Sequence, residues 1–276
     1  MRYGIILTAG DIQEIGDMAA GAEAAGWDGV FFWDGIAIRG IEPIYDPWVT
    51  MAVIAMRTER ARIGAIVTPP SRRRPWKLAR ETLTLDHLSH GRLVLPVGLG
   101  AIDDLAFGGV GEPTDRRTRA DLLDETLEIL TRAWSGESFH YDGRHYHMAE
   151  MAFRPPSVQR PRIPIWVVAL WGRPKSVDRA YRYDGILPYL VGVDGGPRPA
   201  TPDDVREMAA LARQRKGEGE PFDIVLDGTT PDDDPVAARE QVAPLAAEGA
   251  TWWIESPWEN PSVASLRQRI AAGPPR

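Results

Sequence analysis

The sequence predicts a (β/α)8 barrel, the TIM-barrel class of α/β fold, with an insertion after the fourth strand. Short apolar runs alternate with amphipathic segments, and we count eight such β/α units in the 276 residues. This alternation is typical of parallel strands joined by right-handed crossovers. An open doubly wound sheet is the alternative, but the first β/α turn, residues 7–11, lacks the G-x-G-x-x-G pattern of a dinucleotide-binding fold. We therefore expect one barrel domain over residues 1–276.

The elements before residue 100 follow from local patterns. Asp11 can cap a helix whose apolar residues recur at helical spacing until Gly26 ends it. The run Gly29–Trp33 is apolar throughout but too short for a helix, which is typical of a buried parallel strand. The predicted strands are Tyr3–Leu7, Gly29–Trp33, Arg62–Val67 and Leu93–Val97, and the further helices are Pro47–Met56 and Pro75–Leu88.

Residues 101–160 interrupt this rhythm and form the predicted insertion. They contain a Gly-rich loop, a helix with an apolar face that Gly136 ends, and a hairpin turn at Asp142-Gly143. The apolar face of the helix consists of Leu123, Leu127, Leu130 and Trp134. The later strands are predicted at Ile165–Val168, Gly185–Pro188, Asp223–Leu226 and Trp252–Glu255, and the later helices near Lys175–Tyr181, Asp203–Arg215, Val236–Ala247 and Ser262–Ala271.

Composition excludes several classes of function. The formal net charge of −7 disfavours a general nucleic-acid binder, which needs a basic face. The absence of cysteine excludes disulfides, thiolate nucleophiles and zinc–thiolate sites, so redox chemistry would need a bound cofactor. The sequence has no apolar run of membrane-spanning length and no pattern of a signal peptide at its start. We expect a soluble, cytoplasmic protein.

Candidate functional residues follow the strands, because chemistry in a (β/α)8 barrel lies at the carboxyl ends of the strands. The second strand ends at Asp34, which is either a catalytic carboxylate or a cap or loop hydrogen-bond acceptor. The third ends at Thr68 and is followed by Arg72–Arg74. Such a charge run is most often a solvated loop, but we expect at least one of these arginines to contact an anionic ligand.

Loops that contain glycine follow the fourth and fifth strands. The turn Gly98-Leu99-Gly100 would let a planar ligand or a phosphate approach the backbone closely. Residues 169–176 combine a glycine, two cations and a hydroxyl at the start of a helix, where free N–H groups and the helix dipole favour an anion. This loop is the best candidate phosphate site, although Ser176 can also be an ordinary helix cap.

A metal site is disfavoured. His140, His145 and His147 lie close together in the sequence, but no carboxylate ligand pattern accompanies them. Aromatic side chains near the strand ends predict either an apolar pocket lining or a packed barrel core, and they are Trp33, Trp48, Trp171 and Tyr189.

Nine short segments, in order along the chain, match one family pattern. They are Asp46–Trp48, Arg57–Arg60, Gly64–Pro69, Arg74–Arg80, Leu85–Arg92, Val97–Gly100, Leu123–Leu130, Trp134–Glu137 and Pro164–Trp166. Together they resemble the bacterial luciferase-like flavin- and F420-dependent oxidoreductases. The resemblance covers most of residues 1–190 and is fainter at Asp184–Ile186 and in the last strand.

The resemblance implies a (β/α)8 barrel that holds FMN or coenzyme F420, a deazaflavin, at its mouth. It also implies a non-prolyl cis peptide within Gly64–Ile66, behind the ring, and a phosphate contact at Gly172, Arg173 and Ser176. The anionic tail of F420 would suit Arg72–Arg74. The cofactor-binding residues that it implies are Ala65, Ile66, Thr68, Arg73, Gly98, Leu99, Gly100, Leu170, Trp171, Gly172, Arg173 and Ser176.

The sequence departs from the deazaflavin-dependent sugar-phosphate dehydrogenases of this family at two positions. Those enzymes end their second strand in an Asp-His pair whose His is the base, and they carry an acidic residue after the fourth strand; here these positions are Gly35 and Ala101. Their acid/base mechanism therefore does not carry over. Asp34 and Trp48 are the candidate catalytic residues, and hydride transfer depends more on orientation and a dry pocket than on a protein nucleophile.

The prediction is an oxidoreductase that performs hydride transfer or monooxygenation on a small organic substrate. F420 is favoured over FMN, partly because only three of the 32 basic residues are lysines, which indicates a GC-rich genome of the kind in which deazaflavin users are frequent. Two alternatives stay open: a cofactor-binding or sensory protein that has lost catalysis, and a metal-dependent barrel lyase or epimerase. The amphipathic surface helices are compatible with a homodimer.

Overall fold

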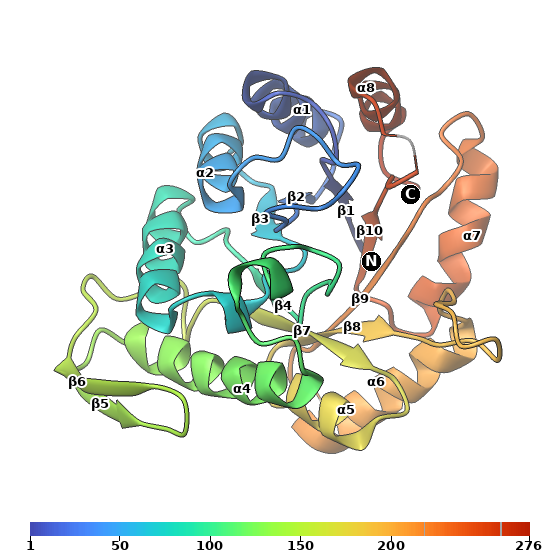
Figure 1. Cartoon of the computed structure of the whole chain (residues 1–276). Helices are drawn as coiled ribbons and strands as arrows, with labels where there is room; N and C mark the ends of the chain where they lie inside the picture. Colours follow the sequence, from blue (N-terminus) through green and yellow to red (C-terminus); the bar gives the residue numbers. More distant parts are fainter. Residues whose placement is uncertain (218, 260) are drawn as a thin grey trace.

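Eight parallel strands curl into a nearly closed barrel (Figure 1). The computed structural model describes residues 1–217, 219–259 and 261–276. The barrel strands are β1 (Arg2–Ile6), β2 (Gly29–Phe32), β3 (Arg62–Ala65), β4 (Leu95–Val97), β7 (Ile165–Leu170), β8 (Gly185–Tyr189), β9 (Asp223–Gly228) and β10 (Trp252–Glu255). They follow the order β3-β2-β1-β10-β9-β8-β7-β4. Parallel bridges between Ile63 and Leu93 and between Thr68 and Val97 join β3 to β4, so the ends of the sheet meet.

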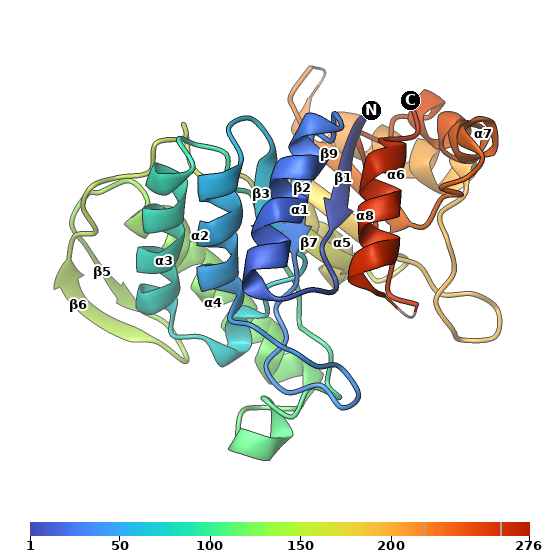
Figure 2. The ribbon, with the colours of Figure 1, turned by 90° about the horizontal axis from the view of Figure 1, so that it is seen from above.

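Helices surround the barrel (Figure 2). They are α1 (Ile12–Ala24), α2 (Pro47–Arg57), α3 (Pro75–Leu88), α4 (Arg116–Ala133), α5 (Pro174–Ala180), α6 (Pro202–Lys216), α7 (Pro235–Ala247) and α8 (Val263–Ala272), with the short 3₁₀ turns η1 (Pro70–Arg72) and η2 (Gly108–Val110). The predicted (β/α)8 barrel is confirmed. The loops from the carboxyl ends of the strands lie on the face that Figure 1 shows.

The helix starts show why the local sequence specifies these elements. Asp11 accepts hydrogen bonds from the backbone N–H groups of Gln13 and Glu14, both at 2.8 Å, and Glu14 accepts from Asp11 N in return. This capping box satisfies N–H groups that a helix end leaves free. Asp46 caps α2 in a similar way, and Pro47 occupies the first helical position, where its missing N–H costs nothing.

Aromatic side chains fill the interior of the barrel. The Trp252 ring lies 5.3 Å from Trp166 and 6.0 Å from Phe31, centroid to centroid, although the three residues belong to β10, β7 and β2. A Cβ at Gly4 or Gly29 would lie 2.5 or 2.6 Å from the Phe31 ring. The two glycines therefore leave the volume that this aromatic cluster occupies, and the packed interior makes a floor beneath the mouth.

The insertion between β4 and β7 contains α4 and a separate antiparallel hairpin, β5 (Phe139–Asp142) and β6 (His147–Met151). The predicted turn at Asp142-Gly143 is confirmed. Glu125 of α4 accepts hydrogen bonds from the backbone N–H groups of Arg144, His145 and Tyr146. A carboxylate on the long helix thus fixes the hairpin turn against it.

Some boundaries differ from the prediction. β3 ends at Ala65 rather than Val67, and the non-prolyl cis peptide joins Ile66 to Val67, one bond beyond the expected range. The alternative of Ser176 as a helix cap is wrong, because α5 begins at Pro174 and the Ser176 hydroxyl accepts a hydrogen bond from Leu170 N at 3.1 Å. Within the described ranges, no helix combines the length and the apolar character needed to span a bilayer.

We predict that Trp166→Ala lowers the free energy of unfolding by about 3–5 kcal/mol, because it leaves a cavity in the aromatic cluster. Trp76→Ala is the control, since Trp76 is 37% exposed on α3 and its loss should cost less than half as much. Urea unfolding followed by circular dichroism measures both values. Equal losses for the two variants would contradict the assignment of Trp166 to the packed floor of the barrel.

Candidate active site at the carboxyl ends of the strands

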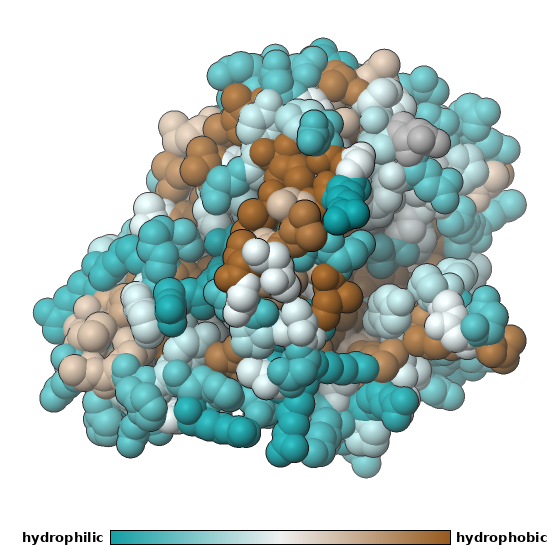
Figure 3. Space-filling model, in the orientation of Figure 1, coloured by the Kyte–Doolittle hydropathy of each residue, from teal (hydrophilic) through white to brown (hydrophobic). Residues whose placement is uncertain are grey.

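The mouth of the barrel is lined with apolar side chains. Figure 3 shows hydrophobic residues gathered across the centre of the face that carries the strand ends. The exposed large apolar residues that belong to the loops after the strands, or to the end of β8, are Ile36, Ile102, Leu105, Val110, Tyr189, Val191, Val193 and Trp258. An exposed apolar patch of this kind is typical of a ligand site or an interface.

An aromatic wall stands at the end of β2. Trp33 lies two residues after Phe31 and so projects from the same, inner face of the strand. Its ring meets that of Trp258 edge to face, with the centroids 5.9 Å apart. A Cβ at residue 35 would lie 2.3 Å from the Trp33 ring, so Gly35 leaves the space that the indole occupies. In the described part of the chain, Trp33 Nε1 has no hydrogen-bond partner.

The ends of β3 and β4 are tied together at Thr68. Its N–H donates to Pro96 O at 2.9 Å, and its carbonyl accepts from Gly98 N at 3.1 Å. Ala65 and Thr68 are buried and Ile66 is half-buried. The Thr68 hydroxyl is buried without a hydrogen-bond partner among the described residues.

The glycine turn after β4 is fixed from outside by Arg119 of α4. Its Nη1 donates to Leu99 O at 2.9 Å and to Gly100 O at 3.3 Å. Gly100 has a φ of +79°, and a Cβ there would lie 2.7 Å from Pro69, so glycine is required. At Gly98 a Cβ would approach side chains of the neighbouring strand ends at 3.1 and 3.2 Å. Both glycines thus allow the close approach of backbone at the rim.

A network of buried charges links three loops of the rim. The Asp34 side chain is 0% exposed and pairs with both Arg72 and Arg73. Arg73 makes a two-pronged contact, with Nε at 3.0 Å from Oδ2 and Nη2 at 2.8 Å from Oδ1. Arg72 also donates to Asp104 Oδ2 at 2.5 Å, and its side chain is 2% exposed. The interpretation of Arg72–Arg74 as a solvated loop is therefore wrong for the first two arginines.

Asp104 extends this network to the loop after β2. Its carboxylate accepts from the backbone N–H groups of Ile36 and Ala37, each at 3.0 Å, and from that of Ala106. Burial alone would raise the pKa of the Asp104 carboxyl, but these hydrogen bonds and the Arg72 guanidinium hold it below its usual range. Asp104 is thus a permanent anion that anchors two loops to each other.

Trp48, the second candidate catalytic residue, is joined to Asp34 through Arg73. The Arg73 guanidinium lies 5.8 Å from the centroid of the Trp48 ring. Trp48 follows the N-cap of α2 and is 7% exposed. Across the described ranges its indole N–H is buried without a partner. The structure therefore brings the two predicted catalytic residues into one cluster, in which the carboxylate is occupied by two guanidinium groups.

The predicted phosphate loop lies at the end of β7. Leu170 and Trp171 are half-buried, whereas Gly172 and Arg173 are exposed. Gly172 has a φ of +82°, and the space where a Cβ would stand is open. Ser176 is half-buried, and its hydroxyl is engaged with Leu170 N. The glycine and the cation thus face solvent, whereas the hydroxyl is held by the end of β7.

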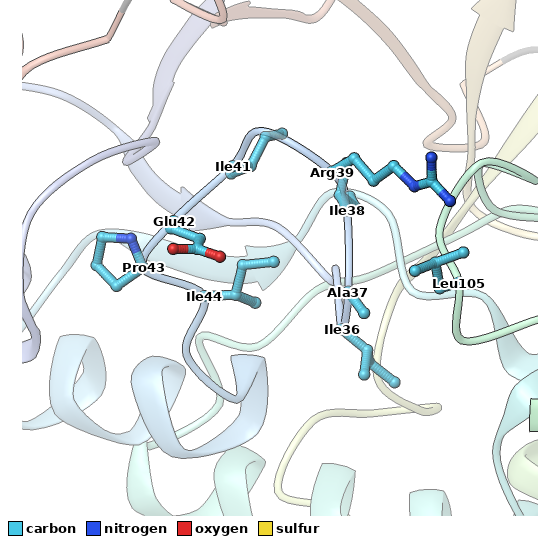
Figure 4. A pocket seen from close by; sticks show the side chains of 9 residues that line it. All are labelled: Ile36, Ala37, Ile38, Arg39, Ile41, Glu42, Pro43, Ile44 and Leu105. Atoms are coloured by element: carbon cyan, nitrogen blue, oxygen red, sulfur yellow. The ribbon is translucent and has the colours of Figure 1, made fainter. Parts of the chain in front are cut away.

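An apolar hollow of about 770 Å³ lies beside the mouth (Figure 4). The loop after β2, residues 36–44, forms most of its wall, and Leu105 from the loop after β4 closes one side. Arg39 and Glu42 are the charged residues in the lining. Leu105 N donates to Ala37 O, which together with Asp104 holds the two loops in register.

The histidine stretch lies on the hairpin of the insertion. His147 Nδ1 is 2.5 Å from Asp142 Oδ1, and both side chains are largely exposed. Across residues 1–217, 219–259 and 261–276, no three His, Asp or Glu side chains gather as metal ligands would.

Sequence reasoning missed Asp104, Arg119 and the buried state of Arg72. Asp103-Asp104 reads as an ordinary acidic loop, and Arg119 lies on a helix whose apolar face drew attention instead. The available signal for these contacts was Phe107. Its side chain is 0% exposed and lies between the guanidinium groups of Arg72 and Arg119, which are 5.1 and 5.2 Å from the centroid of its ring. An aromatic residue in a polar, glycine-containing loop indicates packing against something specific.

We predict that Arg72→Ala destabilises the fold by about 3–5 kcal/mol, because it leaves two carboxylates buried without their shared cation. The matched control is Arg215→Ala, whose partner Asp178 is 50% exposed and whose loss should cost about 1 kcal/mol or less. Urea unfolding at pH 7 measures both. A loss for Arg72→Ala as small as that of the control would show that the network does not hold the rim.

Comparison with known proteins agrees with this architecture. The model of the luciferase-like monooxygenase family matches residues 2–273. An uncharacterised protein of Mycobacterium tuberculosis is 39% identical over 125 residues, which are 45% of this chain and 43% of that protein. An F420-dependent glucose-6-phosphate dehydrogenase of Tsukamurella paurometabola is 32% identical over 162 residues, 57% of this chain and 47% of that enzyme. The chain thus spans about half the length of the curated relatives that it matches.

Among solved structures, a monooxygenase from Streptomyces bottropensis superposes with a TM-score of 0.80 at 19% identity, and the match covers 98% of this chain and 96% of that one. This likeness shows the fold. The barrel, its rim and the match of the family model over nearly the whole sequence lead to one conclusion: the chain belongs to the luciferase-like monooxygenase family.

Proposed function

We propose that this chain is an oxidoreductase that binds a flavin or deazaflavin at the mouth of the barrel and acts on a small organic substrate by hydride transfer or monooxygenation. The observation that carries the proposal is the combination, at one rim, of a glycine turn, an aromatic wall and an exposed cationic loop. These are the surfaces that a planar ring with a phosphorylated tail requires.

The residues present fit such a group. The absence of side chains at Gly98 and Gly100 lets neighbouring side chains pack closely around this turn, which shapes the rim on the side where the ring would lie. The indole N–H of Trp33 lacks a partner in the described chain, although it is buried at the mouth, and a ring carbonyl or ring nitrogen would accept from it. Arg173 and the open space at Gly172 would receive the phosphate, with Ala65, Ile66 and Leu99 against the ring.

When bound, the cofactor would supply a hydride donor or acceptor at its central ring. The chain itself would bind and orient the cofactor and the substrate, and it would exclude water from the site. Arg119 holds the turn at Leu99 and Gly100, and the aromatic wall of Trp33 and Trp258 keeps that side of the mouth apolar. A fixed, dry pocket of this kind lowers the barrier by pre-organisation rather than by a protein nucleophile.

Asp34 has a different role in this proposal from that of a free base. Its carboxylate accepts from Arg72 and Arg73, so its lone pairs are engaged. We assign it the orientation of Arg73 beside Trp48, where the guanidinium adds positive charge close to the mouth.

F420 is the cofactor that we favour over FMN. The similarity to F420-dependent glucose-6-phosphate dehydrogenases supports this choice, as does the cationic character of Arg173 and Lys175 in a chain of net charge −7. Local basic groups in an acidic protein focus an anionic ligand on the site.

The test is to mix the purified chain with F420 or, separately, with FMN, to remove free cofactor by desalting, and to record the visible absorption spectrum. We expect retention of F420. Arg173→Ala should weaken F420 binding about tenfold, because it removes a charge-assisted contact to phosphate. Arg213→Ala, on the exposed side of α6, is the control and should leave the affinity unchanged.

Retention of FMN but not F420 would overturn the choice of cofactor, and the proposed reaction class would stand unchanged. Retention of neither would contradict the proposed function. Tight retention without turnover over a broad substrate panel would favour a binding or sensory protein instead.

A further inference from the structure

The hollow beside the mouth, which residues 36–44 and Leu105 line, has no part in the cofactor site proposed above. Its volume of about 770 Å³ lies within the range of pockets that hold drug-sized organic molecules. We call it the isoleucine hollow, because four isoleucines stand in its lining (Figure 4): Ile36, Ile38, Ile41 and Ile44. Its size suits an organic ligand rather than a single ion.

The wall of the isoleucine hollow is fixed by hydrogen bonds from its backbone. Asp104 accepts from the N–H groups of Ile36 and Ala37, each at 3.0 Å. Leu105 N donates to Ala37 O, also at 3.0 Å. The other three isoleucines are half-buried and pack against the core. The hollow is thus preformed, and a ligand that enters it has little of the loop to order.

The same hydrogen bonds leave the wall with few free polar groups. The N–H groups of Ile36, Ala37 and Leu105 already donate within the protein. The N–H of Ile41 donates to Ile38 O at 3.3 Å. A hydroxyl-rich molecule would lose its water in the hollow without gaining hydrogen bonds in return, which costs free energy. The lining therefore favours apolar surface on the ligand.

The two charged residues of the lining, Arg39 and Glu42, remain in contact with water. Both are exposed, and neither forms an ion pair with another residue that the structure describes. Their charges are opposite, so the lining has no net charge. A phosphate group would be attracted by Arg39 and repelled by Glu42, and solvent weakens both interactions. The hollow thus has no charged site for a sugar phosphate.

The isoleucine hollow adjoins the aromatic wall of the mouth. A Cβ at residue 35 would lie 2.3 Å from the Trp33 ring and 3.0 Å from Ile38 Cδ1, so both side chains reach the same glycine. Leu105, on the other side of the hollow, follows Asp104, which pairs with Arg72 of the rim. An apolar molecule in the hollow would therefore lie next to Trp33, beside the proposed ring.

We propose that the isoleucine hollow binds the substrate, and that this substrate is an uncharged, largely apolar organic molecule rather than a sugar phosphate. The inference rests on the proposed function, because it assigns a class of substrate to the same mouth. Burial of apolar surface against the isoleucines supplies the affinity. The part of the molecule that projects past Trp33 would meet the cofactor.

Binding is tested on the chain without cofactor, by NMR of isotope-labelled isoleucine δ1 methyl groups, with single Ile→Val variants to assign the lining signals. The probes are indole, quinoline and 2-naphthol, which are uncharged bicyclic molecules at neutral pH, and glucose 6-phosphate. We expect at least one bicyclic probe to shift the signals of the four lining isoleucines saturably, and glucose 6-phosphate to leave them in place. Ile186, buried on β8, is the internal reference and its signal should not move.

Leu105→Gln should weaken binding of that probe about fivefold, because it removes apolar contact from one side of the hollow. Leu105 is 45% exposed, so the substitution should leave the fold intact. Val110→Gln is the matched control: Val110 is 70% exposed in η2, outside the lining, and its replacement should leave the affinity unchanged. Arg39→Gln should change the affinity by less than about twofold, since the ligand is uncharged.

The inference fails if every bicyclic probe leaves the four signals in place, if glucose 6-phosphate shifts them, or if Leu105→Gln and Val110→Gln bind the probe equally well. Turnover of glucose 6-phosphate by the cofactor-loaded chain would overturn it as well. The desalting experiment separates these outcomes from failure of the proposed function. A chain that retains cofactor but binds no apolar probe in the hollow contradicts only the class of substrate.

Discussion

The shared burial of Asp34, Arg72 and Asp104 is the constraint on which the rim depends. Each of these charges is almost fully removed from water and is stabilised there by its partners, which for Asp34 include Arg73 and for Asp104 include backbone N–H groups. The three residues come from the loops after β2, β3 and β4, so their pairing ties those loops together. The shape of the mouth is therefore set by electrostatics at the rim and by aromatic packing at its floor.

This constraint has a consequence for chemistry. Both oxygens of the Asp34 carboxylate already accept hydrogen bonds from guanidinium groups, so the positioning of Arg73 is the role that its geometry favours. Gly35 leaves room for the Trp33 indole. On this side, then, the mouth orients and shields a bound ligand.

The barrel could be predicted from the sequence because its signals are local. The Asp11 capping box, the apolar run after Gly29 and the hairpin turn at Asp142 each depend on a few neighbouring residues. The rim could not be predicted from the sequence, because Arg72 and Asp104 are 32 residues apart and meet only when their two loops adopt one conformation.

The central claim is that the mouth of this barrel holds a flavin-type ring. A crystal structure of the chain in complex with F420 tests it most directly. The account predicts the ring against the ends of β3 and β4, with Trp33 beside it and the phosphate along residues 172–176. A ring bound elsewhere, or a mouth filled by the protein's own side chains with F420 present in excess, would contradict it.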